Sequence, residues 1–302
     1  MKKLLVVLLA SLSFAATAAP VQVPIVWPFA AGSNQANYAR AIIEQANADQ
    51  QKYQFYFDNK PGAGGTISAK HVLNYKGLAL LTSSSSFFVR PVYYPNESFN
   101  NADFKPVLIQ CTGQPYIVIS AKYKNIDELR QQKRLTIGVT LGSLTEALAR
   151  ELQLQLPATE LTFIGYNNTL QPTQEMIGGQ LDLNVDLPAS TAQWIDAGKV
   201  NVIGASGTLY HKPFRTFTGQ GITGFEDLVS NYQIVAPATT DPKVIEELHK
   251  ILSQAARKST TLPGLYAVDF CSPADVDLKK TNELYNKWSA NWSKWLHKTE
   301  AK

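Results

Sequence analysis

The stretch QFYFDNKPGAGGT, residues 54–66, decides the fold, because a strand pattern passes through a glycine-rich turn into a helix pattern. We predict the strand at residues 54–58 and the helix at residues 66–73. The same order of strand, turn and helix comes before this stretch, and a third strand follows it. These elements are expected at residues 23–27, 28–34, 35–48 and 78–82. Units of this length predict an α/β fold of parallel strands with helices on both faces.

A second alternating series follows a strand at 115–120 that leads away from the first series. Its elements are expected at residues 135–139, 144–155, 160–164, 170–178, 181–185, 190–197 and 200–206. A last strand is expected at 233–236, followed by a mostly helical C-terminal segment in which Trp288, Trp292 and Trp295 recur at helical spacing and predict core packing.

The order of these series predicts one lobe interrupted by another, with a hinge where the chain crosses between them. At about 150 residues per domain, the 302 residues are also enough for two domains. We expect lobe 1 to consist of residues 19–119 and 236–302, and lobe 2 of residues 120–235.

The first 18 residues are typical of a cleaved secretory signal peptide. Lys2 and Lys3 precede an apolar run at 4–12 and small residues at 16–18. An uncleaved anchor is the alternative, but the run is shorter than the roughly 20 residues that span a bilayer. We therefore expect the mature protein in the periplasm.

Composition excludes several classes of protein. The net charge is +4, from 28 Lys and Arg against 24 Asp and Glu, and the basic residues are scattered rather than clustered. This pattern does not suit nucleic-acid binding. Cys111 and Cys271 could form one disulfide, worth up to about 4 kcal/mol, or remain two buried thiols, and the sequence leaves both open. Neither has a partner at metal-ligand spacing, so we expect no metal and no cofactor.

The sequence contains no recognisable catalytic motif. A G-x-S-x-G elbow and an H-E-x-x-H pair are both missing, and none of the four histidines lies in an interpretable pattern. We assign no catalytic residue. An enzyme on the same two-lobed scaffold remains the alternative, with Asp186 as its one obvious acid–base group.

The two glycine-containing turns, residues 28–34 and 59–66, indicate an anion site. Each connects a strand to a helix, and N–H groups at a helix N-terminus suit a carboxylate or phosphate. Ser33 and Thr66 add hydroxyl groups, and the serine run 83–86 after the third strand faces the same side. Simple turn chemistry is the alternative for the glycines, and loop solubility for the serines.

These features resemble the substrate-binding proteins of tripartite tricarboxylate transporters, the TctC or Bug family. The resemblance covers essentially the whole mature chain and is carried by short motifs. The motifs are PF (28–29), AG (31–32), NKPGAGG (59–65), GGQLD (178–182), LP (187–188), AGKV (197–200) and VAPA (235–238).

The resemblance implies a two-lobed periplasmic binding protein, type II-like, that closes over a small carboxylated solute and delivers it to membrane permease subunits. A receptor that presents itself to a membrane sensor is an alternative partner role. We expect a monomer that binds a dicarboxylate, tricarboxylate, amino acid or aromatic acid. The ligand-binding residues implied by the matching motifs are Phe29, Ala31, Gly32, Ser33, Gly64, Gly65, Thr66, Ser84, Ser143, Thr145, Asn168 and Asp186.

The chain departs from the family pattern after Gly32. Ser33, Asn34, Gln35 and Ala36 stand where the family has a second glycine followed by Ser-Thr-Asp. Asparagine and glutamine both donate and accept hydrogen bonds, so they suit a solute with amide, hydroxyl or ring substituents.

Overall fold

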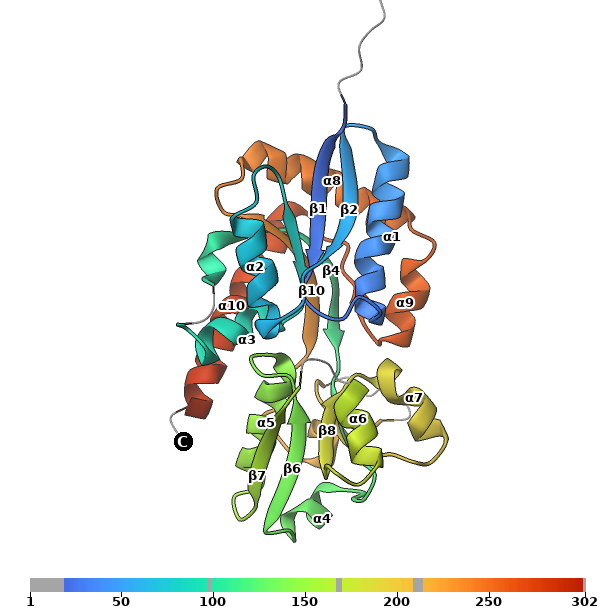
Figure 1. Ribbon diagram of the computed structural model, residues 1–302, viewed down its shortest axis with the longest axis vertical. Coiled ribbons are helices and arrows are strands. Elements are labelled where there is room, and N and C mark those ends of the chain that lie inside the picture. Colours follow the sequence, from blue (N-terminus) through green and yellow to red (C-terminus); the bar gives the residue numbers. More distant parts are fainter. Residues whose placement is uncertain (1–18, 97–98, 167–169, 209–213, 301–302) are drawn as a thin grey trace, which may run out of the picture.

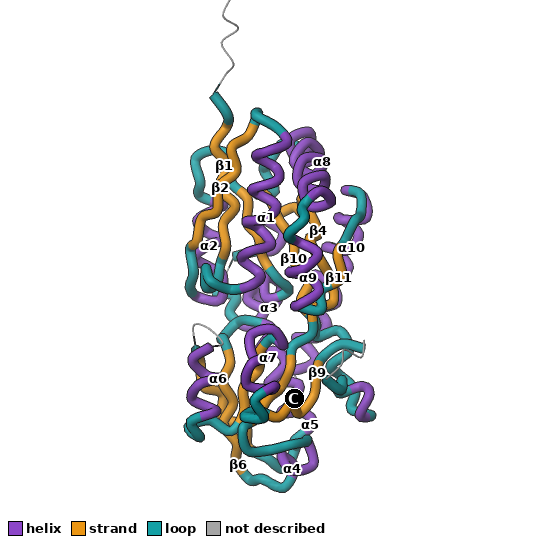
Figure 2. The backbone as a smooth tube through the Cα atoms, turned by 90° about the vertical axis from the view of Figure 1, so that its right-hand side faces the viewer, coloured by secondary structure: helices purple, strands orange, loops and turns teal. Residues whose placement is uncertain are grey.

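The computed structural model describes residues 19–96, 99–166, 170–208 and 214–300, with only the backbone for residues 294–300. The predicted signal peptide therefore lies outside the described residues. The chain forms two lobes stacked along the long axis, each built on its own β-sheet (Figures 1 and 2). The prediction of a two-lobed α/β fold is confirmed.

The sheet of lobe 1 has six strands in the order β11-β4-β10-β3-β1-β2. They are β1 (Val21–Trp27), β2 (Tyr53–Asn59), β3 (Leu80–Ser83), β4 (Phe104–Gln114), β10 (Ser230–Pro237) and β11 (Ser272–Pro273). Strands β1, β2 and β3 are parallel, so their carboxyl ends meet at one edge of the sheet. Residues 23–27 of β1 are buried throughout, as expected for a strand covered on both faces.

Helices cover both faces of this sheet. The first face carries α1 (Asn34–Asp49), α8 (Pro242–Lys258) and α9 (Leu262–Val268), which share one apolar cluster with the strands. The second face carries α2 (Thr66–Leu73), α3 (Ser86–Tyr93) and α10 (Leu278–Glu300). Figure 1 shows α1 and α9 to the right of the strands and α2, α3 and α10 to the left.

The sheet of lobe 2 has five strands in the order β7-β6-β8-β5-β9. They are β5 (Ile117–Ser120), β6 (Arg134–Val139), β7 (Glu160–Gly165), β8 (Leu183–Asp186) and β9 (Asn201–Ala205). Its helices are α4 (Ile126–Arg130), α5 (Leu144–Gln155), α6 (Leu170–Ile177) and α7 (Pro188–Asp196). Short 3₁₀ turns complete the fold at Ala63–Gly65, Asn101–Asp103 and Thr218–Gln220.

Both sheets are mixed, which corrects the expectation of parallel strands alone. Strand β10 runs antiparallel to β3 and β4, and β5 runs antiparallel to β8 and β9. Each of these two is the first strand that the chain forms in its sheet after changing lobes. It enters from the edge where the parallel strands end, so no crossover helix reverses its direction.

The expected lobe boundaries fall inside strands and need correction. A division after residue 119 cuts β5, which pairs entirely within the second sheet, and a division after residue 235 cuts β10, which pairs entirely within the first. The sheets place the first change of lobe between Gln114 and Ile117, and the second between Ala205 and Ser230. These two connections form the hinge segments.

The C-terminal segment is fastened to lobe 1 in two ways. Cys111 of β4 and Cys271, directly before β11, form a disulfide with a Cα–Cα distance of 5.7 Å, which decides between the two alternatives left by the sequence. In α10, Trp292 is buried and Trp288 packs beside it against the apolar cluster that also contains α3 and α5. The prediction of core packing is confirmed for these two tryptophans, whereas the side chain of Trp295 lies outside the described residues.

Candidate functional site

The carboxyl ends of β1 and β3 place two polar segments of lobe 1 at the junction of the lobes. One is the turn that leads into α1, where Ser33 caps the helix, and the other is Ser84–Ser86 at the start of α3. From lobe 2, residues 140–143 and the start of α5 lie opposite. A hydrogen bond of 3.0 Å from the Leu144 backbone N–H to Ser86 Oγ connects the two sides.

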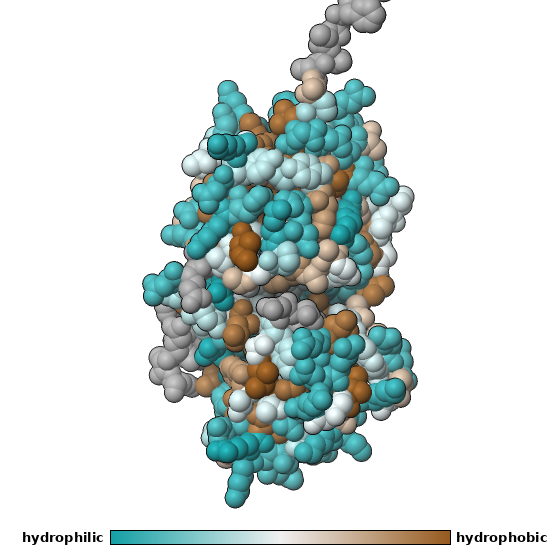
Figure 3. Space-filling model, viewed as in Figure 1, coloured by the Kyte–Doolittle hydropathy of each residue, from teal (hydrophilic) through white to brown (hydrophobic). Residues whose placement is uncertain are grey.

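A cavity of about 400 Å³ lies between these segments. Figure 3 shows an indentation of the surface at the level of this junction. The described lining residues come from both lobes and from the first hinge segment, and none of them carries a charged side chain. They are Trp27, Phe29, Ala30, Gly32, Ser33, Gln35, Ser84, Ser86, Tyr116, Thr140, Ser143, Thr145, Leu170, Leu187, Ser190 and Tyr232.

Three serine hydroxyls of lobe 1 are oriented as hydrogen-bond donors. Ser33 Oγ accepts from the Ala36 N–H at 3.2 Å, and Ser84 Oγ accepts from the Ser86 N–H at 3.3 Å. Ser86 Oγ accepts from lobe 2, as described above. Each oxygen is thus held by an N–H group, and no described residue accepts the hydroxyl hydrogen of any of the three. A solute in the cavity can accept from all three serines.

The hydroxyls of Ser143 and Thr145 in lobe 2 are used within their own loop. Ser143 Oγ donates to the Thr140 carbonyl at 2.7 Å, so it accepts from Thr145 Oγ1, which lies 2.9 Å away. Thr145 Oγ1 in turn accepts from the Thr140 N–H at 2.8 Å. This closed set of bonds fixes the shape of the loop and leaves the donors of lobe 1 to interact with a solute.

Aromatic side chains form the apolar part of the cavity. Trp27 and Phe29 contact each other edge to face, with 5.5 Å between ring centroids. Tyr116 of the first hinge segment and Tyr232 of β10 also line the cavity, and both side chains are almost fully buried. Burial raises the pKa of both phenols, so they stay neutral at physiological pH. A flat or aliphatic solute body fits such walls.

Six of the predicted ligand-binding residues line this cavity. They are Phe29, Gly32, Ser33, Ser84, Ser143 and Thr145. Ala31 lies beside them, and its carbonyl accepts from the Arg40 side chain at 2.9 Å. Asn168 lies outside the described residues. The fold brings these six residues to one cavity, and their contact with a solute stays a prediction.

The second glycine turn does not line this cavity. Gly64 and Gly65 border a separate space of about 10 Å³, room for at most one water molecule, and Thr66 is buried beside them. Gly64 instead contacts lobe 2: a methyl group on its Cα would lie 2.9 Å from the Leu141 carbonyl oxygen. The turn therefore serves close approach of the two lobes.

Asp186 is also placed away from the cavity. Its side chain is fully buried at the end of β8, where it accepts from Thr173 Oγ1 and from the Leu187 N–H, both at 2.7 Å. These bonds fix the turn into α7. In this position the carboxylate supports the local backbone, and its predicted contact with a solute stays a prediction.

Several lining residues of the cavity could not be recognised from any sequence pattern. Tyr116 lies in the first hinge segment and Tyr232 in β10, and the pairing of β10 with β4, the strand that leads into that segment, brings them to the same wall. Gln35 and Ser86 were within reach of sequence reasoning, because one follows the helix cap Ser33 and the other ends the serine run.

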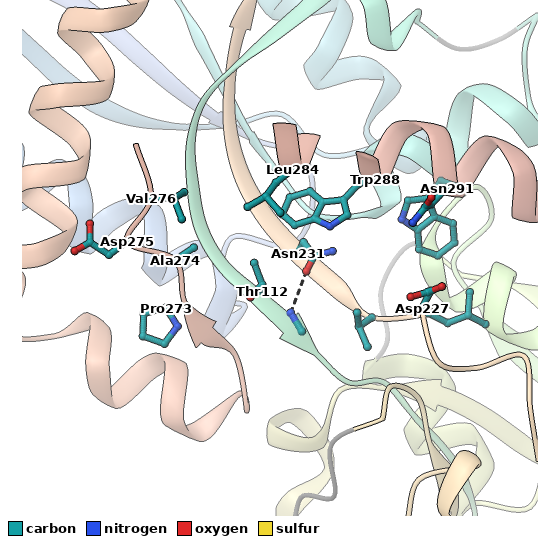
Figure 4. Close-up of a pocket in the computed structure, with 14 residues that line it drawn as sticks. Thr112, Asp227, Asn231, Pro273, Ala274, Asp275, Val276, Leu284, Trp288 and Asn291 are labelled. Atoms are coloured by element: carbon teal, nitrogen blue, oxygen red, sulfur yellow. Dashed lines mark hydrogen bonds between the residues drawn. The ribbon is translucent and has the colours of Figure 1, made fainter. Parts of the chain in front are cut away.

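A larger cavity of about 580 Å³ lies on the other side of the hinge, between β4, β10 and α10. Figure 4 shows the Trp288 indole reaching from α10 toward Asn231, whose side-chain oxygen accepts from the Gly113 N–H at 3.0 Å. All its walls belong to lobe 1 or to the second hinge segment. Lobe closure therefore cannot enclose a solute there, and the smaller cavity is the better candidate.

The described residues contain no group of three or more His, Cys, Asp or Glu side chains that is suited to hold a metal ion. No helix in the described part of the chain is long and apolar enough to span a bilayer.

Comparison with known proteins places this geometry among binding proteins. The family model for the tripartite tricarboxylate transporter family receptor, TctC, matches residues 39–299. A protein from the tcbD-tcbE intergenic region of Pseudomonas sp. (strain P51) is 26% identical over 249 residues, which are 77% of this chain and 73% of the relative.

Solved structures with low sequence identity share the fold. The periplasmic binding protein BugD aligns with a TM-score of 0.77 at 23% identity, over 94% of this chain and 98% of that chain. The R. palustris protein Rpa4515 with adipate has a TM-score of 0.78 at 18% identity, over 94% and 98% of the two chains. MatC from Rhodopseudomonas palustris with bound malate has a TM-score of 0.76 at 19% identity, over 93% and 99%.

Proposed function

The chain belongs to the TctC family of tripartite tricarboxylate transporter receptors, and we propose that it encloses a small carboxylated solute between its lobes and delivers it to membrane permease subunits. The observation that carries the proposal is the cavity between the lobes, where Ser33, Ser84 and Ser86 present hydroxyl hydrogens that no described residue accepts. The family supports a periplasmic location for the mature protein.

The carboxylate binds at the N-terminus of α1. Backbone N–H groups in the first turn of a helix lack acceptors within the helix and carry partial positive charge. Helix α1 has 16 residues and no acidic residue in its first turn, so nothing in that turn competes with a ligand anion. With the three serines, these groups hold a carboxylate without a cationic side chain.

The described lining side chains are suited to binding a solute and not to converting it. The titratable side chains among the described lining residues are Tyr116 and Tyr232, whose pKa values are raised by burial. Neither is poised as a base near neutral pH. Malate and adipate are the ligands named for two proteins of the same fold, and both are carboxylates. We therefore propose that the solute is released unchanged.

The test is binding of a panel of carboxylates to the purified mature protein. A binding acid raises the unfolding free energy by about 2.7 kcal/mol at one hundred times its Kd, which appears as a higher Tm. Calorimetry then gives the affinity, and mass spectrometry of the recovered solute shows whether it has changed. If no carboxylate in the panel binds, or if the protein converts the solute, the proposal is wrong.

A matched pair of variants locates the site. Ser84→Ala removes one donor to the carboxylate and should weaken binding about tenfold or more, because hydrogen bonds to charged groups are worth roughly 1.5–3 kcal/mol. Ser253→Ala removes a buried serine of α8 whose hydroxyl donates to the Lys250 carbonyl, outside the cavity. The Ser253→Ala variant should bind the carboxylate with the same affinity as the wild type.

A further inference from the structure

Among the described lining residues of the cavity, Gln35 is the one whose side-chain amide is held in a single orientation by a buried carboxylate. It belongs to the first turn of α1 and is 5% exposed. Its Nε2 donates to Asp269 Oδ2 at 3.0 Å. Asp269 caps the C-terminus of α9, far along the chain, and its side chain is fully buried.

The partners of Asp269 prevent the amide from turning over. The Tyr38 hydroxyl donates to the same oxygen, Oδ2, and burial raises the Tyr38 pKa, so this phenol remains a donor. Oδ2 thus accepts two hydrogen bonds and has none to give. The other oxygen, Oδ1, is buried and accepts no hydrogen bond within the described part of the chain. Burial raises the pKa of this carboxyl group, although the Asn34 side chain lies near enough to lower it in part. A proton on the carboxyl group would therefore reside on Oδ1. In either protonation state the Gln35 nitrogen, not its oxygen, must face Asp269.

The Gln35 oxygen therefore faces the solute. It has no partner among the described residues, and it is not among the polar atoms sealed from solvent. The solvent-filled space that Gln35 lines is the cavity between the lobes. The cavity thus has donors at Ser33, Ser84 and Ser86, and a fixed acceptor at Gln35.

Building on the proposed function, we propose that Gln35 is a specificity-determining residue that accepts a hydrogen bond from a hydroxyl, amino or amide group of the bound carboxylate. Asp269 and Tyr38 act as positioning residues. The solute class is a monocarboxylate with one donor group on an apolar body, and that body lies against Trp27 and Tyr232. A second carboxylate in place of the donor would meet the Gln35 oxygen and be repelled.

The test compares probes of equal length that differ at one end. Hexanoate, 6-hydroxyhexanoate, 6-aminohexanoate and adipate form one series, and benzoate, 4-hydroxybenzoate, 4-aminobenzoate and terephthalate form another. In at least one series, calorimetry on the wild type should give at least tenfold tighter binding for the donor-bearing acids than for the parent acid. The parent acid leaves the Gln35 side-chain oxygen without a hydrogen-bond donor inside the closed cavity, which explains its weaker affinity.

Two variants separate specificity from folding. Gln35→Met keeps the volume but removes the acceptor, so the preference for donor-bearing acids should fall to less than threefold while the parent acid keeps its affinity. Asp269→Leu removes the acceptor that fixes the Gln35 amide, so the amide can turn and present its nitrogen as well as its oxygen. The variant should lose the preference for the hydroxy acid over adipate or terephthalate while the parent acid keeps its affinity, a pattern that mere loss of packing does not produce.

The outcomes distinguish this inference from the proposed function. If no acid of either series binds the wild type, the proposed function fails. If the acids bind but the wild type does not discriminate, or if Gln35→Met discriminates as well as the wild type, the role of Gln35 is refuted and carboxylate binding stands. Loss of the preference for the hydroxy acid over the diacid in Asp269→Leu, together with loss of discrimination in Gln35→Met, supports the inference.

Discussion

Replacing Gly64 with alanine should hold the lobes apart and weaken solute binding, although Gly64 does not line the cavity. Its φ of +59° is left-handed, and a methyl group there would lie 2.9 Å from the Leu141 carbonyl oxygen and 3.1 Å from Arg90 Cδ. Arg90 belongs to lobe 1 and Leu141 to lobe 2. The new methyl group therefore pushes on the opposite lobe.

Two costs add up at this position. A left-handed alanine costs about 1–2 kcal/mol in any conformation of the lobes. The contact with Leu141 adds about 1–3 kcal/mol, a typical penalty for overpacking, but only when the lobes are closed. The second cost alone changes the closing equilibrium, by about 5- to 150-fold. Solute affinity falls by the same factor if the solute binds the closed form.

Gly198→Ala is the matched control. Gly198 follows α7 with φ of +67°, and a methyl group on it would meet nothing within 4 Å. It shares the left-handed cost and lacks the contact between lobes. Small-angle scattering should give a larger radius of gyration for Gly64→Ala than for Gly198→Ala, and calorimetry with the best-binding acid should give a weaker affinity. Equal radii and equal affinities for the two variants would refute the reasoning.

Three further predictions concern the contacts around the hinge. Replacing Cys111 and Cys271 together with serine should lower the unfolding free energy by about 2–4 kcal/mol in urea, and a double variant as stable as the oxidised wild type would contradict this. Tyr94→Phe removes the hydroxyl that donates to Glu146 of lobe 2 at 3.2 Å, so calorimetry should give an affinity about fivefold weaker, whereas an unchanged affinity would exclude this bond from closure. Trp292→Ala should lower the unfolding free energy by about 3–5 kcal/mol in the same urea assay, because the Trp292 indole projects from α10 into a buried apolar cluster. A loss of less than about 1 kcal/mol would show that other contacts hold α10 in place.

Local patterns predicted most of the elements correctly. The helices expected at 66–73 and 144–155 have these bounds in the structure, because apolar spacing and a preceding turn define both ends. Helix α3 was missed, since it begins in a serine run and contains Pro91, both of which suggest a loop. Strand β4 was missed because Lys105, Gln110 and Gly113 interrupt its apolar residues.

The site was predictable where it depends on strand ends and unpredictable where it depends on the opposite lobe. Ser33 and Ser84 follow parallel strands, and parallel strands end at a common edge. A glycine-rich turn, in contrast, suits both an anion and the close approach of another segment. Which applies to Gly64 depends on Leu141, and no local pattern specifies that contact.

The hydroxyl of Ser86 links solute binding to closure. Its oxygen accepts from the Leu144 N–H, and that donor belongs to lobe 2, so the bond exists only when the lobes meet. Once the bond forms, the hydroxyl hydrogen can no longer turn toward α5 and is left for an acceptor in the cavity. A carboxylate that accepts this hydrogen stabilises the orientation that lobe 2 requires. By linkage, closure must strengthen carboxylate binding by the same factor by which the carboxylate favours closure. A neutral hydroxyl suits this coupling better than an arginine, because a fixed cation would attract the anion equally well with the lobes apart.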